Sequence, residues 1–169
     1  LFEDAIVPVT DLIGGVDRGW TVGKRLLQFE RSTHAGINIS GSQGGRTEES
    51  QLPELVAYYS GKVDGRIADV SIRTWLTQHE MNTHAQQITQ RRAIAELQSR
   101  APGFTSSAVK LTNALNIQDG DELLMTAMGN SAYHWDTDSG ASEGEVAAVK
   151  KWLYQKSLTI AGGTKEVQL

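Results

Sequence analysis

The chain has 169 residues, of which 39% are hydrophobic and 21% are charged, and its formal net charge is −4. This is the composition of one ordinary globular domain, and an acidic balance without a basic stripe argues against nucleic-acid binding. There is no cysteine, which excludes disulfides and thiolate metal sites, and no run approaches the roughly 18 apolar residues of a membrane span.

The first segments of the chain change from a strand-like to a helical pattern. Residues 1–16 are predicted to be extended, because β-branched residues dominate around Pro8 until Gly14-Gly15 ends the run. From Gly19 onwards, residues of one face recur at spacings of three and four, which predicts a helix; they are Trp20, Gly23, Leu26, Leu27, Glu30, His34 and Ile37. Residues 41–53 are predicted to be a loop by their composition.

Two helices are predicted between Leu52 and Arg100, a stretch rich in helix-forming residues. Gly61 and Gly65 are expected to divide it into a short helix and a long one, and the long helix is expected to include Ile67. Ala101-Pro102-Gly103 is expected to end the long helix.

Two more helices are predicted in the last third of the chain. One covers Ser107 to Met128, weakened at Asp119-Gly120-Asp121, and a loop follows over 129–141. Ser142 and Glu145 then form a capping box that begins the next helix, and Gly162-Gly163 is expected to end it. These elements predict an all-α protein, an antiparallel up-and-down four-helix bundle with a short extended N-terminal segment.

The sequence HEMNTH, from His79 to His84, approaches a zinc-protease motif without matching it. Two metal-binding histidines on a helix need a spacing of four, whereas these two are five apart and lie about 140° apart around the helix axis. We therefore interpret them as surface or partly buried histidines and predict no metal site. The paired Glu-x-x-His motifs of a di-iron bundle are also absent.

Glu30 is the most informative polar residue of the first helix, because it lies within the apolar periodic face. A carboxylate among apolar neighbours costs free energy unless it is paired or functional. Partial burial favours its protonated form and suits a general base. The alternative is a structural carboxylate at the edge of the face, paired with Arg31 or His34.

Four segments, in order along the chain, resemble the C-terminal helical domain of acyl-CoA dehydrogenases. The first is LFEDAIVPVTDLIGGVDRGWTVGKRLLQFER, with Val7-Pro8, Gly19-Trp20 and Leu27 to Arg31 at the positions of the family's domain junction and first helix. The others are ADVSIRTWL (68–76), PGFTSSAVKL (102–111) and IAGGTKEVQ (160–168). The resemblance implies that 1–16 is the end of a middle β-domain or a linker. It also implies that 17–169 is the helical bundle domain, excised from a longer chain and ending before its last helix.

The resemblance also implies a function. Members of the family use FAD to oxidise acyl-CoA to trans-2-enoyl-CoA, and in some branches the base that takes the α-proton lies on the first bundle helix. Glu30 occupies that place and is the expected catalytic base, with Arg31 orienting it or binding the substrate. Gly163, Thr164 and Glu166 are the expected FAD-binding residues, because the family's Gly-Gly-Thr turn closes over the flavin.

The expected partners follow from the same resemblance. They are an acyl-CoA substrate, an electron-transfer partner, and other subunits in a homo-oligomer (dimer or tetramer) or a hetero-oligomer, in cytoplasmic fatty acid metabolism. Two family motifs differ here: GSQGGRTEESQLP replaces the Arg-x-Gln-Phe-Gly motif, and AMGNSAYHW lacks the paired glycines of the third helix. These differences favour the alternative, a non-catalytic subunit that assembles with an active partner.

Overall fold

The computed structural model describes residues 3–34, 51–99, 105–138 and 140–168. Apart from a two-stranded hairpin, the regular elements of these residues are helical, which confirms the predicted all-α class. The α-helices are α1 (Gly19–His34), α2 (Leu52–Ser60), α3 (Val70–Gln98), α4 (Thr105–Met128), α5 (Glu143–Gln155) and α6 (Lys165–Gln168). None of them is both long and apolar enough to cross a bilayer.

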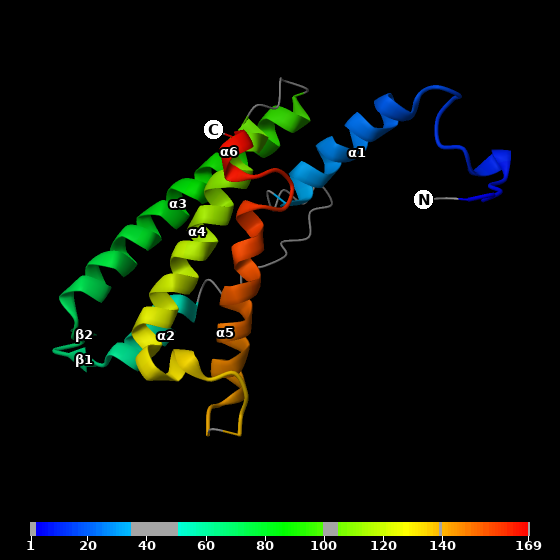
Figure 1. Cartoon of the computed structure of the whole chain (residues 1–169). Helices are drawn as coiled ribbons and strands as arrows, with labels where there is room; N and C mark the ends of the chain where they lie inside the picture. The colour runs from blue at the N-terminus through cyan, green and yellow to red at the C-terminus, as the bar shows by residue number, and fades with distance from the viewer. Residues whose placement is uncertain (1–2, 35–50, 100–104, 139, 169) are drawn as a thin grey trace.

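Helix α4 is the centre of the structure. The helices α1, α2, α3, α5 and α6 all contact it, and α3, α4 and α5 run side by side along much of their length (Figure 1). The chain reverses direction between α3 and α4 and again between α4 and α5 (Figure 1). Helix α1 lies at one end and extends away from the other helices, whereas the hairpin lies at the opposite end (Figure 1).

The N-terminal segment contains no strand within residues 3–16, which corrects the strand-like interpretation of this region. Val9–Asp11 forms a turn of 3-10 helix (η1) directly after Pro8. Ile6 and Val7 are exposed, and no other segment of the described chain pairs with them. A strand needs a neighbour for its backbone hydrogen bonds, so β-branched residues alone do not produce one here.

The region between α2 and α3 contains a hairpin that the sequence pattern did not predict. Strand β1 (Lys62–Val63) pairs antiparallel with β2 (Arg66–Ile67). Asp64 and Gly65 form the turn, and both have positive φ, as the Asp-Gly turns of tight hairpins do. Gly61 and Gly65 thus divide the region as predicted, but Ile67 belongs to β2 instead of the long helix.

Other predicted boundaries also shift. Residues 41–50 of the predicted loop over 41–53 lie outside the described residues. Leu52 and Pro53 already belong to α2, since proline is accepted in the first turn of a helix. Helix α4 continues through Gly120 without a break. Helix α5 ends at Gln155 and a 3-10 turn, η4 (Lys156–Thr159), follows it, so the glycines at 162 and 163 do not end that helix.

The core lies where α2, α3 and α5 meet the second half of α4. One cluster joins α2, β2 and α4, and Ile72, Trp75 and Leu76 of α3 pack against it. Its buried members are Leu52, Val56, Ala57, Ile67 and Leu123. A second cluster joins Met125 and Met128 of α4 to Val149 of α5. Both clusters hold the walls of the cavity described below.

Candidate functional site

The predicted base lies on α1. Glu30 is half-buried near the C-terminal end of this helix, which contacts α4. The side chain of Arg31, the predicted substrate-binding residue, lies outside the described part of the structure. The roles of the two residues stay predictions.

The apolar face of α1 is largely uncovered in this chain. Trp20 is 75% exposed, Leu26 is 67% exposed and Leu27 is 46% exposed. The periodic face that predicted the helix is thus real, but these side chains do not enter a core within the described residues. Large exposed apolar surfaces of this kind commonly mark contact sites for other protein surfaces.

The predicted FAD-binding residues lie in and just after a turn that precedes α6. Gly162 and Gly163 have φ of 67° and 102°, values that favour glycine. Thr164 is half-buried and Glu166 is exposed. The pKa of Glu166 is lowered by its own backbone N–H, the largest cause, and by the Thr164 hydroxyl. The pair between Lys165 and Glu166, at 3.8 Å, is exposed and stabilises little.

A buried cation lies against this turn. Lys110 of α4 is only 3% exposed, and its Nζ donates a hydrogen bond of 2.6 Å to the backbone carbonyl of Gly163. Burial lowers the pKa of Lys110, because removal from water disfavours the charged ammonium. The sequence pattern gave no sign of this contact, since the two residues lie far apart in the chain.

The segment that leads to the turn is also tied to α4. The Gln118 side chain donates a hydrogen bond of 2.9 Å to the carbonyl of Gln155, one of the last carbonyls of α5, which lack partners within their own helix. Lys156 donates to the carboxylate of Glu122, and this pair lowers the pKa of Glu122. The region from 155 to 163 is therefore held against α4 at several points.

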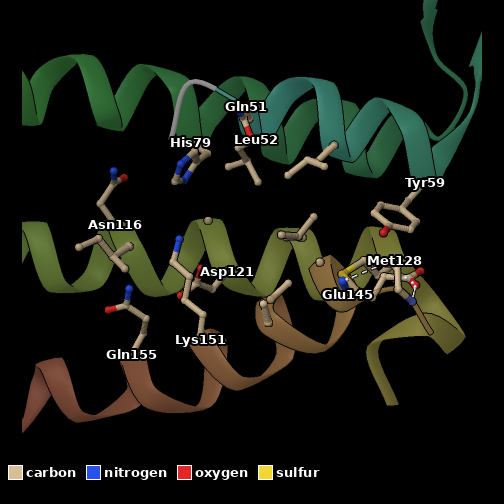
Figure 2. A pocket seen from close by; sticks show the side chains of 18 residues that line it. Gln51, Leu52, Tyr59, His79, Asn116, Asp121, Met128, Glu145, Lys151 and Gln155 are labelled. Atoms are coloured by element: carbon tan, nitrogen blue, oxygen red, sulfur yellow. Dashed lines mark hydrogen bonds between the residues drawn. The ribbon is translucent and has the colours of Figure 1, made fainter. Parts of the chain in front are cut away.

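A cavity of about 930 Å³ lies among α2, α4 and α5 (Figure 2). Its walls are mainly apolar, with Leu52 and Leu55 from α2, Ile117 and Leu124 from α4, and Ala148 from α5. Polar side chains lie toward its two ends: His79 and Asn116 at one, Tyr59 and Glu145 at the other (Figure 2).

At the first polar end, two side chains of α3 contact the carboxylate of Asp119. Asp119 accepts a hydrogen bond of 2.8 Å from the indole N–H of Trp75, and its other oxygen lies 2.7 Å from His79 Nδ1. His79 is 5% exposed, and its Nε2 lies 3.4 Å from the Thr83 hydroxyl. Because Asp119 accepts at Nδ1, that nitrogen carries the proton.

The second polar end is the start of α5. The Ser142 hydroxyl accepts from the Glu145 N–H at 3.2 Å, and the Glu145 carboxylate accepts from the Ser142 N–H at 2.8 Å. The predicted capping box is thus confirmed. The Ser142 backbone bond is the largest cause of the lowered pKa of Glu145. Burial, with Glu145 nearby, raises the pKa of Tyr59.

The histidines of the HEMNTH motif have separate environments. His79 is buried against Asp119, whereas His84 is exposed. Among the described residues, no three His, Asp or Glu side chains gather in a way that could hold a metal ion. His84 is a surface histidine, as interpreted, whereas His79 is buried instead of partly buried, and its partner was missed. The sequence pattern indicated Asp119 only as part of a segment that weakens its helix.

Comparison with known proteins gives one match. The family model described as "Acyl-CoA dehydrogenase, C-terminal domain" matches residues 17–169. No curated protein and no solved structure matches the chain.

Proposed function

We propose that this chain serves the oxidation of acyl-CoA to trans-2-enoyl-CoA. The chain belongs to the acyl-CoA dehydrogenase family through its C-terminal domain. The family match over 17–169 carries this proposal. It is supported by Glu30, a half-buried carboxylate on the first helix of the matched region. The protein would act as the C-terminal domain of an FAD-dependent enzyme of cytoplasmic fatty acid metabolism.

The turn before α6 suits a flavin by the chemistry of its donors. Gly162 and Gly163 have no side chains and permit a close approach to the backbone. The Thr164 backbone N–H is a donor of the kind that phosphate and flavin carbonyl oxygens accept. We propose that Gly163, Thr164 and Glu166 contact FAD, which when bound would accept the hydride from the β-carbon of the substrate.

Glu30 is the proposed catalytic base. A carboxylate can take a proton from a reacting group that lies within hydrogen-bond reach, and Glu30 is half-buried on the first helix of the matched region. In this proposal Glu30 removes the α-proton of the thioester, and Arg31 either orients the Glu30 carboxylate or binds the substrate. The α-proton and the β-hydride then leave the substrate for different acceptors.

The exposed face of α1 supports a role in assembly. We propose that Trp20, Leu26 and Leu27 pack against other parts of the assembled protein, either a second copy or a related subunit. In that assembly α1, α3, α4 and α5 would form the up-and-down four-helix bundle expected for the domain. An electron-transfer partner would reoxidise the flavin.

A non-catalytic assembly subunit is the second candidate function. The family's paired glycines would fall near Gly129, where the chain instead forms a 3-10 turn, η3 (Gly129–Tyr133). The stretch that replaces the Arg-x-Gln-Phe-Gly motif lies mostly outside the described residues. A site without these two motifs would hold FAD less strongly.

The visible spectrum of the purified intact protein distinguishes the two functions. The dehydrogenase proposal expects yellow protein whose flavin absorption bleaches when acyl-CoA thioesters are added without oxygen. If the protein is yellow but acyl-CoA of any chain length fails to bleach it, the result would contradict the dehydrogenase activity and still support FAD binding. Colourless protein that takes up no added FAD would refute the cofactor and favour the assembly subunit.

A further inference from the structure

Lys110 is a buried charge that the proposed chemistry does not use. Within the described part of the chain it is the one buried lysine or arginine. Lys110 donates to a neutral backbone oxygen, the carbonyl of Gly163, and a carbonyl does not neutralise an ammonium. Burial of a charge without an opposite charge is costly, and an apolar side chain would fill the same space without that cost.

The hydrogen bond from Lys110 fixes one peptide of the turn. Every peptide bond of the described chain is trans, so the C=O and N–H of one peptide point in opposite directions. Because the Gly163 carbonyl faces Lys110 of α4, the N–H of Thr164, which belongs to the same peptide, faces away from α4.

The contact restricts a turn that contains two glycines. Gly162 and Gly163 have no Cβ and reach many backbone conformations at similar cost, so a hydrogen bond to the Gly163 carbonyl limits a freedom that these two residues bring to the turn. A hydrogen bond from a charged donor is stronger than one between neutral groups. An ammonium behind the carbonyl also polarises the peptide and makes its N–H a better donor.

We infer that Lys110 is a positioning residue, which holds the Gly163–Thr164 peptide so that its N–H is presented to an oxygen of the flavin cofactor. The flavin part of this inference rests on the proposed function. The orientation of the turn does not, because it depends only on contacts within the chain. The two parts can therefore fail separately.

The test compares three variants of the intact protein by amide hydrogen exchange and by FAD binding. Lys110→Met keeps most of the aliphatic stem and removes the donor, Lys110→Arg keeps a charged donor, and Lys62→Met removes an exposed lysine of the hairpin. The reporters are the amides of Ile160, Ala161 and Val167, which donate to Ser157 or Thr164 around the turn.

We expect K110M, without FAD, to exchange these amides at least about tenfold faster, because a hydrogen bond to a charged group contributes more than one factor of ten. Exchange in the middle of α3 should not change, and K110R should restore part of the protection. K62M should match the wild type. FAD should bind K110M at least about tenfold more weakly, by the same reasoning.

Unchanged exchange around the turn would overturn the inference, and so would equal acceleration in α3 and the turn, which would indicate general destabilisation. If the wild type binds no FAD, the proposed function fails, and the exchange data alone decide whether Lys110 fixes the turn. If K110M does not fold, the contact between Lys110 and Gly163 is tested in the wild-type protein by nuclear magnetic resonance. A coupling between Lys110 Nζ and the Gly163 carbonyl carbon supports the contact, and its absence overturns it.

Discussion

His79 of α3 and Asp119 of α4 are joined by a contact of 2.7 Å between Nδ1 and Oδ2. The other carboxylate oxygen of Asp119 accepts from Trp75, which is also on α3. One carboxylate therefore satisfies two donors from the facing helix and fixes how the two longest helices of the described chain meet beside the cavity.

Removal of that carboxylate is predicted to destabilise the protein. Asp119→Ala leaves the His79 and Trp75 donors without their acceptor, and an unsatisfied buried donor costs roughly 1–3 kcal/mol. Urea unfolding followed by tryptophan fluorescence measures the change. Glu80→Ala, which removes an exposed carboxylate of α3, is the matched control and should change stability by no more than about 0.5 kcal/mol. Equal effects of the two substitutions would contradict the assigned role of Asp119.

Gly120→Ala is predicted to destabilise α4 although alanine is the better helix former. A Cβ at this position would lie 2.9 Å from His79 Cε1 and 3.1 Å from Nε2. The clash is expected to cost roughly 1–3 kcal/mol and to exceed the roughly 1 kcal/mol gained in helix propensity.

Gly23→Ala is the control for this prediction, because a Cβ there meets nothing within 4 Å. It should stabilise α1 by roughly 0.5–1 kcal/mol. Chemical denaturation and helix content by circular dichroism measure both variants. If Gly120→Ala stabilised the protein as much as Gly23→Ala does, the result would contradict the close packing of His79 against α4 at Gly120.

The capping box of α5 is predicted to make stability depend on pH in the acid range. The folded pKa of Glu145 lies below its ordinary value because Ser142 donates to the carboxylate. The resulting stability is fully present above the ordinary carboxylate pKa and is lost as pH falls through the lowered folded value. Unfolding measured from pH 6 down to pH 3 should therefore show a smaller decline in Glu145→Gln than in the wild type.

Ser142→Ala tests the same cap at neutral pH. It removes the hydroxyl that accepts from the Glu145 N–H and should cost about 1 kcal/mol in the free energy of unfolding. Ser157→Ala, an exposed serine of η4, is the control. A Ser142→Ala protein as stable as this control would show that the cap contributes little.

Glu30→Gln is predicted to abolish turnover and to leave FAD binding intact. The amide keeps the size of the side chain but cannot take the α-proton, so acyl-CoA should no longer bleach the flavin without oxygen. Glu80→Gln, on the exposed side of α3, should behave as the wild type. Normal bleaching by Glu30→Gln would move the catalytic base to another residue.

The exposed face of α1 is predicted to drive self-association, with at least a dimer in light scattering. Leu26→Glu places a charge on that face and should reduce the molecular mass measured by light scattering, because a buried unpaired charge opposes association. Thr21→Glu adds the same charge to an exposed position of α1 outside the apolar face. This control should leave the measured molecular mass unchanged. A wild-type protein that is monomeric at high concentration would contradict the prediction.

The sequence predicted those elements whose causes are local. The capping box at Ser142 and Glu145, the division at Gly61 and Gly65, and the helix that begins at Gly19 were all identified from neighbouring residues. The β1–β2 hairpin was missed, although Asp64-Gly65 is a turn signal, because each strand is only two residues long and the apolar periodicity continued across it.

The site was less predictable than the helices. Glu30 and the turn at Gly163 and Thr164 came from a resemblance, and their proposed roles stay predictions. Lys110 and the His79–Asp119 pair were missed because each depends on residues brought together from distant parts of the chain. A pattern within one helix carries no information on which side chain of another helix will face it.

The close approach of His79 to Gly120 is expected to make the two positions interdependent in evolution as well as in space. A relative with any side chain at position 120 is expected to carry a residue smaller than histidine at position 79, and thus to lose the partner of Asp119. Loss of the imidazole would in turn relax the requirement for glycine. Exchange at these two sites should therefore occur together, as a correlated change that identifies related proteins with the same packing of α3 on α4.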